Sequence, residues 1–124
     1  MSFNSFEELE VWKKSKIFRL RITAVAKTFP KEEKYRLTDQ IIRSSRSISA
    51  NIAEGFGRFH RQENIQFCRI ARGSLYETLE HIICGFDENY ITEEVYQELR
   101  NQFNDVLKLL NGYIAYLKKS KAAQ

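Results

Sequence analysis

The strongest constraint on the fold of this chain is the spacing of its apolar residues, which recur every three or four positions in four separate segments. Such a spacing places apolar side chains on one face of an α-helix, whereas the strict alternation of a half-buried strand is nowhere sustained. The predicted helices span about residues 6–29, 33–57, 61–88 and 92–118. The chain is therefore expected to be all-α.

Local signals mark the ends of these helices. Ser5, with Glu8 three residues later, has the form of a capping box. The single proline, Pro30, should end the first helix at Phe29, because the residue before a proline is disfavoured in the helical region. Thr92 followed by two glutamates predicts the cap and first turn of the last helix. The connections between helices are therefore expected to be short.

The apolar residues form one seam on each predicted helix. The seams are Val11, Ser15, Phe18, Ile22, Val25 and Phe29; Leu37, Ile41, Ser45, Ile48 and Ile52; Ile65, Cys68, Arg72, Leu75, Leu79, Ile82 and Phe86; and Tyr96, Leu99, Phe103, Val106, Leu110, Tyr113 and Leu117. Long amphipathic helices with short connections pack as an up-down-up-down bundle, and sevenfold seams favour left-handed packing. The sequence predicts such a four-helix bundle as a single domain over residues 1–124.

Several large apolar residues lie outside these seams. They are Trp12, Ile42, Phe56, Phe67, Ile70, Tyr76 and Ile83. Apolar surface beyond what one bundle buries is typical of an interface between protein copies. The chain is therefore expected to form a homo-oligomer.

Composition and cysteine spacing narrow the class of protein. With 43% hydrophobic and 29% charged residues, the chain has the balance of an ordinary soluble protein. It shows neither a signal-peptide pattern nor the roughly 18 uninterrupted apolar residues of a membrane span, so we expect a cytoplasmic protein. Cys68 and Cys84 lie in one predicted helix, roughly 24 Å apart. This is too far for a disulfide, and both are expected to be small core or half-buried residues.

The sequence predicts no catalytic residues, metal or cofactor. A di-metal site in a bundle needs paired Glu-x-x-His motifs, but the histidines are His60 and His81, and Glu77 precedes His81 by four positions. The serines at positions 44, 45, 47 and 49 have no histidine near them in the sequence. They are interpreted as small residues that let helices approach closely.

Gly55 and Gly57 do not form a known phosphate-binding loop. A dinucleotide fingerprint needs three glycines between a strand and a helix, and a Walker loop needs a following lysine with serine or threonine. Neither pattern is present around these glycines. We expect one glycine to end the second helix in the left-handed conformation, and the other to permit a close backbone crossing.

Charge is unevenly distributed along the chain, whose net charge is +4. Residues 34–72 hold eight Lys or Arg against three acids. Residues 87–99 hold five acids and neither Lys nor Arg. The molecule should therefore have a basic region and an acidic region.

The candidate nucleic-acid-binding residues lie in the basic region and are Arg43, Arg46, Arg58, His60, Arg61, Arg69 and Arg72. Arginine forks suit phosphate oxygens, and Phe56 or Phe59 offers a ring on which an unpaired base can stack. The alternative is a solvated basic face, in which Arg58 pairs with Glu54 four residues earlier. Arg72, in the third seam, is expected to pair with a carboxylate, such as that of Glu54.

Three stretches resemble a known family. They are FEELEVWKKS near the start, FPKEEKYRLTDQIIRSSRSISANIAEGFGR in the middle and FCRIARGSLYE in the third predicted helix. Together they are similar to the four-helix-bundle family of 23S rRNA-intervening-sequence proteins, over Phe6 to about Leu117. The residues that match the family motif, with an expected structural role, are Asn51, Glu54, Gly55, Gly57, Arg58, Gly73, Ser74, Leu75 and Glu77.

The resemblance implies a left-handed bundle that assembles into a homopentameric barrel and lacks catalytic residues. A similar fold belongs to the accessory variability proteins of diversity-generating retroelements, which bind nucleic acid and a reverse transcriptase. Two positions depart from the family pattern. Ser49 stands where proline is common, so a kink there should be absent or milder. His60 and Arg61 stand where serine or threonine is usual, so the cap of the third helix should be weak.

We therefore expect a non-enzymatic oligomer that binds RNA or other nucleic acid through arginines of its second and third helices. The alternative, from a different class, is a protein-interaction scaffold that recruits an acidic or enzymatic partner without touching nucleic acid. A reverse transcriptase is a candidate partner, and no contact with a membrane is expected.

Overall fold

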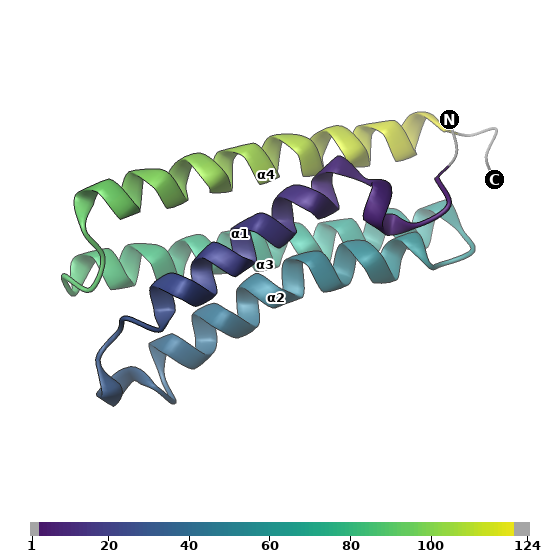
Figure 1. Cartoon of the computed structure of the whole chain (residues 1–124). Coiled ribbons are helices and arrows are strands. Elements are labelled where there is room, and N and C mark those ends of the chain that lie inside the picture. The colour runs from purple at the N-terminus through teal and green to yellow at the C-terminus, as the bar shows by residue number, and fades with distance from the viewer. Residues whose placement is uncertain (1–2, 121–124) are drawn as a thin grey trace.

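The computed structural model describes residues 3–120, and this range contains four long α-helices, two short 3-10 helices and no strand. The long helices are α1 (Glu10–Ala26), α2 (Leu37–Phe56), α3 (Arg61–Asp87) and α4 (Glu93–Lys119). They run lengthwise beside one another, and successive helices point in opposite directions (Figure 1). The predicted all-α, four-helix fold is confirmed. No helix among residues 3–120 is long and apolar enough to cross a membrane.

The first predicted helix is interrupted near its start. A 3-10 turn, η1 (Phe6–Glu8), is separated from α1 by Leu9, whose backbone is extended with φ −75° and ψ 128°. Leu9 is buried, so the interruption turns an apolar side chain into the core. Ser5 does act as a cap, because its Oγ accepts a hydrogen bond from Glu7 N, but it caps η1 rather than a long helix.

The connection between α1 and α2 is longer than predicted. α1 ends three residues before the expected Phe29, and α2 begins at Leu37 rather than near residue 33. Between them, Pro30 is extended and a second 3-10 turn, η2, covers Lys31–Glu33. Arg36, with φ −121° and ψ −109°, lies outside the helical region. The chain therefore reverses direction in this connection before the second long helix begins.

The core confirms most of the predicted seams. All six residues of the first seam and four of the five in the second are buried. In α3 the prediction was wrong in part, because Arg72 is only half-buried and the core positions belong to Ala71, Thr78 and Gly85. Leu79 and Phe86 are half-buried as well. Short side chains at these core positions allow α3 to lie close to its neighbours.

The two ends of the bundle differ in the segments they contain. At one end, η1 and the last turns of α4 lie near the connection between α2 and α3 (Figure 1). At the other end lie the α1–α2 and α3–α4 connections. The basic α2–α3 turn and the acidic α3–α4 turn therefore stand at opposite ends of the molecule.

Candidate nucleic-acid interface

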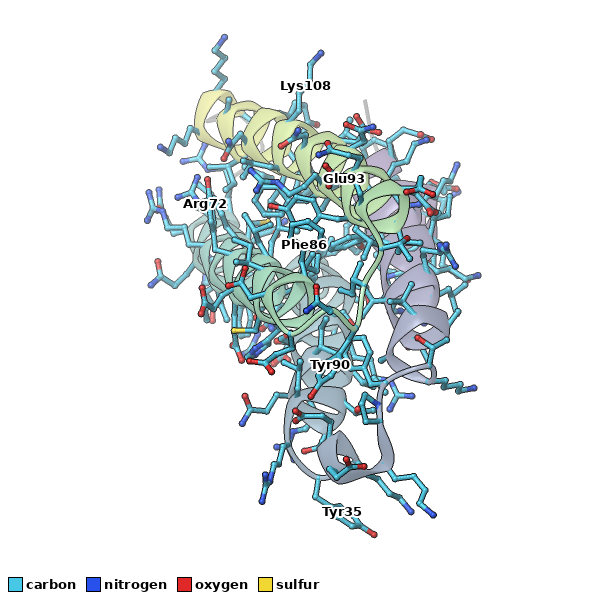
Figure 2. All side chains as sticks on the ribbon, turned by 90° about the vertical axis from the view of Figure 1, so that its left-hand side faces the viewer. Tyr35, Arg72, Phe86, Tyr90, Glu93 and Lys108 are labelled. Carbon is cyan, nitrogen blue, oxygen red and sulfur yellow. The ribbon has the colours of Figure 1, made fainter. Side chains whose placement is uncertain are left out.

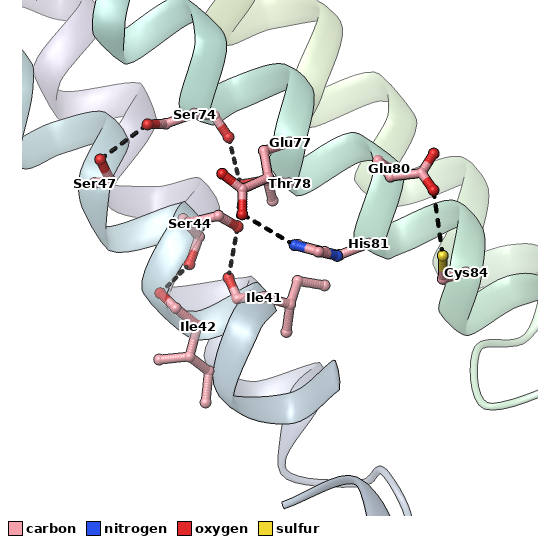
Figure 3. Close-up of polar contacts among 11 residues, drawn as sticks. Ile41, Ile42, Ser44, Ser47, Ser74, Glu77, Thr78, Glu80, His81 and Cys84 are labelled. Atoms are coloured by element: carbon pink, nitrogen blue, oxygen red, sulfur yellow. Dashed lines mark hydrogen bonds and ion pairs between the residues drawn. The ribbon is translucent and has the colours of Figure 1, made fainter. Parts of the chain in front are cut away.

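Small polar residues join α2 to α3 and so position the arginines on both helices. The Ser44 and Thr78 hydroxyl oxygens are 2.8 Å apart, and those of Ser47 and Ser74 are 2.9 Å apart (Figure 3). Short side chains let the two backbones approach, and the hydrogen bonds satisfy hydroxyl groups that would be costly to bury alone. Ser44 and Ser47 thus lie at the contact between α2 and α3, as their interpretation as helix-packing residues requires, and Ser74 lies at the same contact.

Gly55 lies where α2 crosses α3 at close range. A Cβ atom at Gly55 would lie 2.8 Å from both Asn64 Oδ1 and Phe67 Cβ. Real Cβ atoms do not tolerate such distances, so only glycine fits there without a shift of the helices. One turn earlier, Asn51 Nδ2 donates to the backbone oxygen of Ser47 at 2.8 Å. The predicted close crossing at one of the glycines is confirmed.

The other two motif glycines, Gly57 and Gly73, are less tightly surrounded than Gly55. Gly57 follows α2 with φ −77°, so the prediction of a left-handed glycine at this helix end was wrong. Its N–H instead donates to Ala53 and Glu54 oxygens, which tightens the last turn without a change of handedness. A Cβ at Gly73 would meet nothing within 4 Å. Ser49 lies inside an unbroken α2, where its Oγ accepts from Arg19 Nε at 3.0 Å.

Arg58 is held in place by three neighbours in the turn between α2 and α3. Its Nη2 lies 2.9 Å from Glu54 Oε2, which confirms the predicted surface pair, and its Nη1 lies 3.8 Å from Glu63 Oε2. Its guanidinium also lies over the Phe67 ring, 4.7 Å from the centroid. Arg58 therefore neutralises two carboxylates and is not a free phosphate ligand.

Arg61, the first residue of α3, has unsatisfied hydrogen-bonding groups. Its side chain is half-buried, and its Nε and Nη1 atoms are buried without a hydrogen-bond partner in the described part of the chain. Before it, His60 is extended, and its side chain makes no capping hydrogen bond to α3. The weak cap predicted for this helix is confirmed.

A cavity of about 150 Å³, here called the corner hollow, opens beside this turn. It is lined by Arg58, Phe59, His60, Arg61, Asn64, Tyr116, Leu117 and Ser120. Tyr116 and Leu117 belong to the end of α4 and Ser120 is its C-cap, more than 50 residues after the turn in the chain. No pattern in the sequence points to that contact, so the sequence could not have identified these residues.

The other candidate arginines lie along the bundle rather than at the turn. Arg43, Arg46 and Arg69 are exposed. Arg43 Nη1 lies 3.9 Å from Asp39 Oδ2, and Arg69 Nη1 donates to Gln66 Oε1 at 3.4 Å. Arg43 is about 22 Å from Arg58 along α2, at about 1.5 Å per residue. The structure therefore brings Arg58, His60 and Arg61 together and spreads the remaining arginines along α2 and α3.

Arg72 corrects two predictions. It does not lie in the core seam, and its Nη1 donates to Asn111 Oδ1 of α4 at 2.8 Å instead of pairing with Glu54. Figure 2 shows Arg72 on the outside of α3 beside α4. Its side chain is on the surface because Ala71 takes the neighbouring core position. Arg72 therefore links two helices through a neutral partner and keeps its positive charge unpaired by any carboxylate in the described residues.

A second, larger cavity lies at the same end of the bundle. Its volume is about 440 Å³, and its lining is mostly apolar, with Phe3, Leu9, Val11, Leu109, Tyr113 and Tyr116 beside Glu8 and Glu10. Tyr116 lines this cavity and the corner hollow. The end of α4 therefore separates an apolar cavity from a basic one.

The cysteines are free, as expected from their spacing. Cys68 is buried and Cys84 is half-buried. Burial raises the pKa of the Cys68 thiol to about 12, so the thiolate is disfavoured there. The structure shows no group of three or more His, Cys, Asp and Glu among residues 3–120 that could hold a metal ion.

The acidic region contains an ion pair between α1 and α4. Arg21 donates from Nε and Nη2 to the two carboxylate oxygens of Glu98, at 2.7 and 2.9 Å. These hydrogen bonds lower the pKa of Glu98 and raise that of Arg21. The fork geometry stabilises the contact between the first and last helices.

Comparison with known proteins places this fold in a family. The family model described as 23S rRNA-intervening sequence protein matches residues 7–112. The chain belongs to this family. The resemblance seen in its three motifs is thus confirmed. The family relation to retroelement accessory proteins stays a prediction.

A solved structure supports the same family assignment. It is the crystal structure of a protein with unknown function from the S23 ribosomal protein family of Bacteroides thetaiotaomicron. The two chains share 33% sequence identity with a TM-score of 0.78, over 85% of this chain and 95% of the other. The comparison with curated proteins found no match. Neither matching description names a catalytic activity.

Proposed function

We propose that this protein is a non-enzymatic binder of RNA or other nucleic acid, which contacts the phosphate backbone through the basic surface of α2 and α3. The observation that carries the proposal is the positive charge of residues 34–72, which contain eight Lys or Arg and three Asp or Glu. Arg43, Arg46 and Arg69 from this region are exposed. Exposed arginines along two adjacent helices suit sequence-independent phosphate contacts.

Nucleic-acid binding is tested by charge reversal on this surface. Because Arg58 stands between Glu54 and Glu63, Arg58→Glu would gather three carboxylates and disturb the fold. The double variant Arg46→Glu/Arg69→Glu avoids this, since both side chains are exposed and neither pairs with a carboxylate in the described residues. Lys14→Glu/Lys27→Glu is the matched control, because it changes the net charge equally from exposed positions on and just after α1.

The readout is affinity for a mixed panel of RNA and DNA across a salt series. The unmodified protein should lose affinity steeply as salt rises, because bound phosphates release counterions. Arg46→Glu/Arg69→Glu should weaken binding and reduce the magnitude of the salt slope by about 2, and the control should change the slope by less. Absence of binding at low salt would refute the proposed function. The second candidate, a scaffold that recruits a protein such as a reverse transcriptase, would then be preferred.

We further propose that the protein assembles into a homopentamer, as the family resemblance implies. Large apolar side chains on two helices, Ile17 and Leu20 on α1 and Ile70 and Tyr76 on α3, are exposed in the single chain. Burial of such side chains between copies would stabilise an assembly. Light scattering should give five times the 14.7 kDa mass of the chain, and a monomer mass at micromolar concentration would contradict the assembly.

A further inference from the structure

The corner hollow contains an arginine that lacks an acceptor. Arg61 lines the hollow, and its buried Nε and Nη1 atoms find no partner among residues 3–120. A guanidinium has five N–H donors in a planar fork and cannot lose its charge, so buried donors without acceptors are costly. Because Nε and Nη1 are closed to solvent, a ligand in the hollow would reach them only if the Arg61 side chain turned toward it, and a phosphate would then supply the missing acceptors and match the fork.

The surroundings of Arg61 favour an anion. The carboxylates of Glu54 and Glu63 lie near the turn, but Arg58 pairs with both. The first turn of α3 has no side-chain cap, so its N–H groups and the positive end of the helix dipole also favour negative charge. Lys118 and Lys119 lie in the last turn of α4, between Leu117 and Ser120, which line the hollow. At this corner the positive end of α3 and the basic side chains of the turn therefore oppose the negative end of the α4 dipole, which Ser120 marks.

The size of the hollow restricts the bound group. Pockets that enclose a whole drug-sized ligand occupy about 300–1,000 Å³. The corner hollow, at about 150 Å³, therefore suits a small group such as a phosphate. The remainder of a nucleotide would have to lie outside it, against the surface of the turn.

Phe59 provides that surface. Its side chain is 92% exposed, which is unusual for a large apolar residue. The ring lies edge to face with the His60 ring, with centroids 4.8 Å apart, and it also borders the hollow. An exposed aromatic ring next to a phosphate site can stack on a base. Bases in a duplex are already stacked on each other, so the available base is unpaired.

We propose that the corner hollow binds one unpaired nucleotide of a single strand, with its phosphate on Arg61 and its base against Phe59. The subsite rests on the proposed function, since the nucleotide belongs to the nucleic acid bound along α2 and α3. The subsite adds a preference for single strands over duplexes, which the arginines alone do not provide. Phosphate contacts are common to single and double strands, whereas a stacking residue discriminates between them.

The experiment compares two probes and three variants. The probes are a labelled oligouridylate of about 12 nucleotides, within the range of single-strand site sizes, and an RNA duplex of the same length. Phe59→Ala removes the ring, and Arg61→Gln removes the charge. Tyr35→Ala is the matched control, because Tyr35 is an aromatic residue that is 83% exposed and projects away from the bundle (Figure 2). It belongs to the α1–α2 connection, which lies at the opposite end of the bundle (Figure 1).

Phe59→Ala should weaken oligouridylate binding by about fivefold or more, the lower range for loss of one base stack, and leave duplex binding within about twofold. Arg61→Gln should weaken oligouridylate binding and lower the salt slope by about 1. Tyr35→Ala should bind both probes like the unmodified protein. If circular dichroism shows that Arg61→Gln does not fold, the result for Phe59→Ala alone tests the subsite. This variant should fold, because an exposed ring does not support the core.

Three results would overturn the subsite. If Phe59→Ala binds oligouridylate normally while Arg46→Glu/Arg69→Glu weakens binding, the subsite is wrong and the proposed function stands. If Phe59→Ala weakens both probes equally and lowers the oligomer mass in light scattering, Phe59 is a contact between copies. If the unmodified protein binds neither probe at low salt, the subsite and the proposed function fail together.

Discussion

The two turns at opposite ends of α3 are built in contrasting ways. After α3, Asn89 adopts a positive φ of 64°, and the N–H groups of Asn89 and Tyr90 donate to the oxygens of Phe86 and Gly85. These are the two hydrogen bonds of a Schellman motif, which satisfies the last carbonyls of a helix. Before α3, the turn has no side-chain cap, exposes Phe59 and leaves Arg61 without acceptors.

The α3–α4 turn is also tied to the rest of the bundle. Tyr90 Oη donates to Glu33 Oε2 of η2 at 2.9 Å, and Ile91 is buried against Gly85. Thr92 then caps α4, because its Oγ1 accepts from Val95 N, as predicted from the sequence. A turn whose groups are all engaged stabilises the fold. The α2–α3 turn, by contrast, has free donors and an exposed ring, which are available to a ligand. The difference between the two turns therefore points to the α2–α3 turn as the place where a ligand binds.

The largest effect is expected from adding a methyl group at Gly55, beside the basic turn. In Gly55→Ala the new Cβ would lie 2.8 Å from Phe67 Cβ and 3.1 Å from the Asn64 backbone oxygen, neither of which can move without a shift of α3. Overpacking costs about 1–3 kcal/mol, more than the helix-propensity gain of up to about 1 kcal/mol. We expect a net loss of about 1–2 kcal/mol in the free energy of unfolding, measured by urea denaturation.

Two other glycines serve as controls for Gly55→Ala. At Gly85 a Cβ would meet the ends of the buried Ile91 and Phe29 side chains and no backbone atom, so Gly85→Ala should cost less. At Gly73 nothing lies within 4 Å, so Gly73→Ala should stabilise by about 0.5–1 kcal/mol. Equal effects at Gly55 and Gly85 would show that the helices near the basic turn are no more tightly fitted than those near the acidic one.

A smaller effect is expected at Asn89, which carries the Schellman motif of the acidic turn. Its positive φ disfavours residues with a Cβ, and asparagine tolerates this conformation better than alanine. Asn89→Ala should destabilise the protein by about 1 kcal/mol, and Asn89→Gly should be neutral or stabilising. Thermal unfolding of both variants measures this. A Gly variant as unstable as the Ala variant would mean that the asparagine side chain, rather than its backbone conformation, supports the turn.

The smallest effect concerns pH and the Arg21–Glu98 pair near the acidic end. Because Arg21 lowers the pKa of Glu98 in the folded state, the pair stabilises the protein above the unfolded-state pKa of the carboxyl group. This stability is lost as pH falls through the lower, folded-state pKa. The side chains are 37% and 41% exposed, so solvent screening limits the contribution to roughly 1 kcal/mol or less.

Glu98→Gln tests this pH dependence. The difference in unfolding free energy between the variant and the unmodified protein should be present at neutral pH and smaller at an acidic pH below the lowered folded-state pKa of Glu98, where the carboxyl group is protonated in both folded and unfolded states. A difference that is the same at both pH values would assign the effect to packing or hydrogen bonding instead of charge.

Much of the fold could be predicted because it depends on local patterns. Every residue of the first seam is buried, and all but Phe29 lie on α1, since apolar periodicity marks the buried face of a helix. Thr92 was recognised as a cap from the residues that follow it. The seam of α3 was wrong at Arg72 because Ala71, Thr78 and Gly85 are small and do not stand out as core residues in a hydrophobic pattern.

The candidate site was predictable only in part. Arg58, His60 and Arg61 are adjacent in the sequence, so their gathering at one turn follows from the chain itself. The burial of Arg61 Nε and Nη1 does not follow, and neither does the exposure of Phe59 instead of Phe56, which packs against the core. Both properties depend on which neighbouring elements reach the turn. The spacing of residues in the sequence does not predict these tertiary contacts.

The sequence by itself determined the number of helices, most of their buried faces, the family and the separation of basic from acidic regions. Each of these follows from periodicity, a motif or local composition, all of which can be recognised within one stretch of the chain. Only the tertiary structure decided that the end of α4 would meet the α2–α3 turn and enclose the corner hollow around Arg61. The physical reason is that this cavity is formed by side chains more than 50 residues apart, whose meeting depends on how whole helices pack.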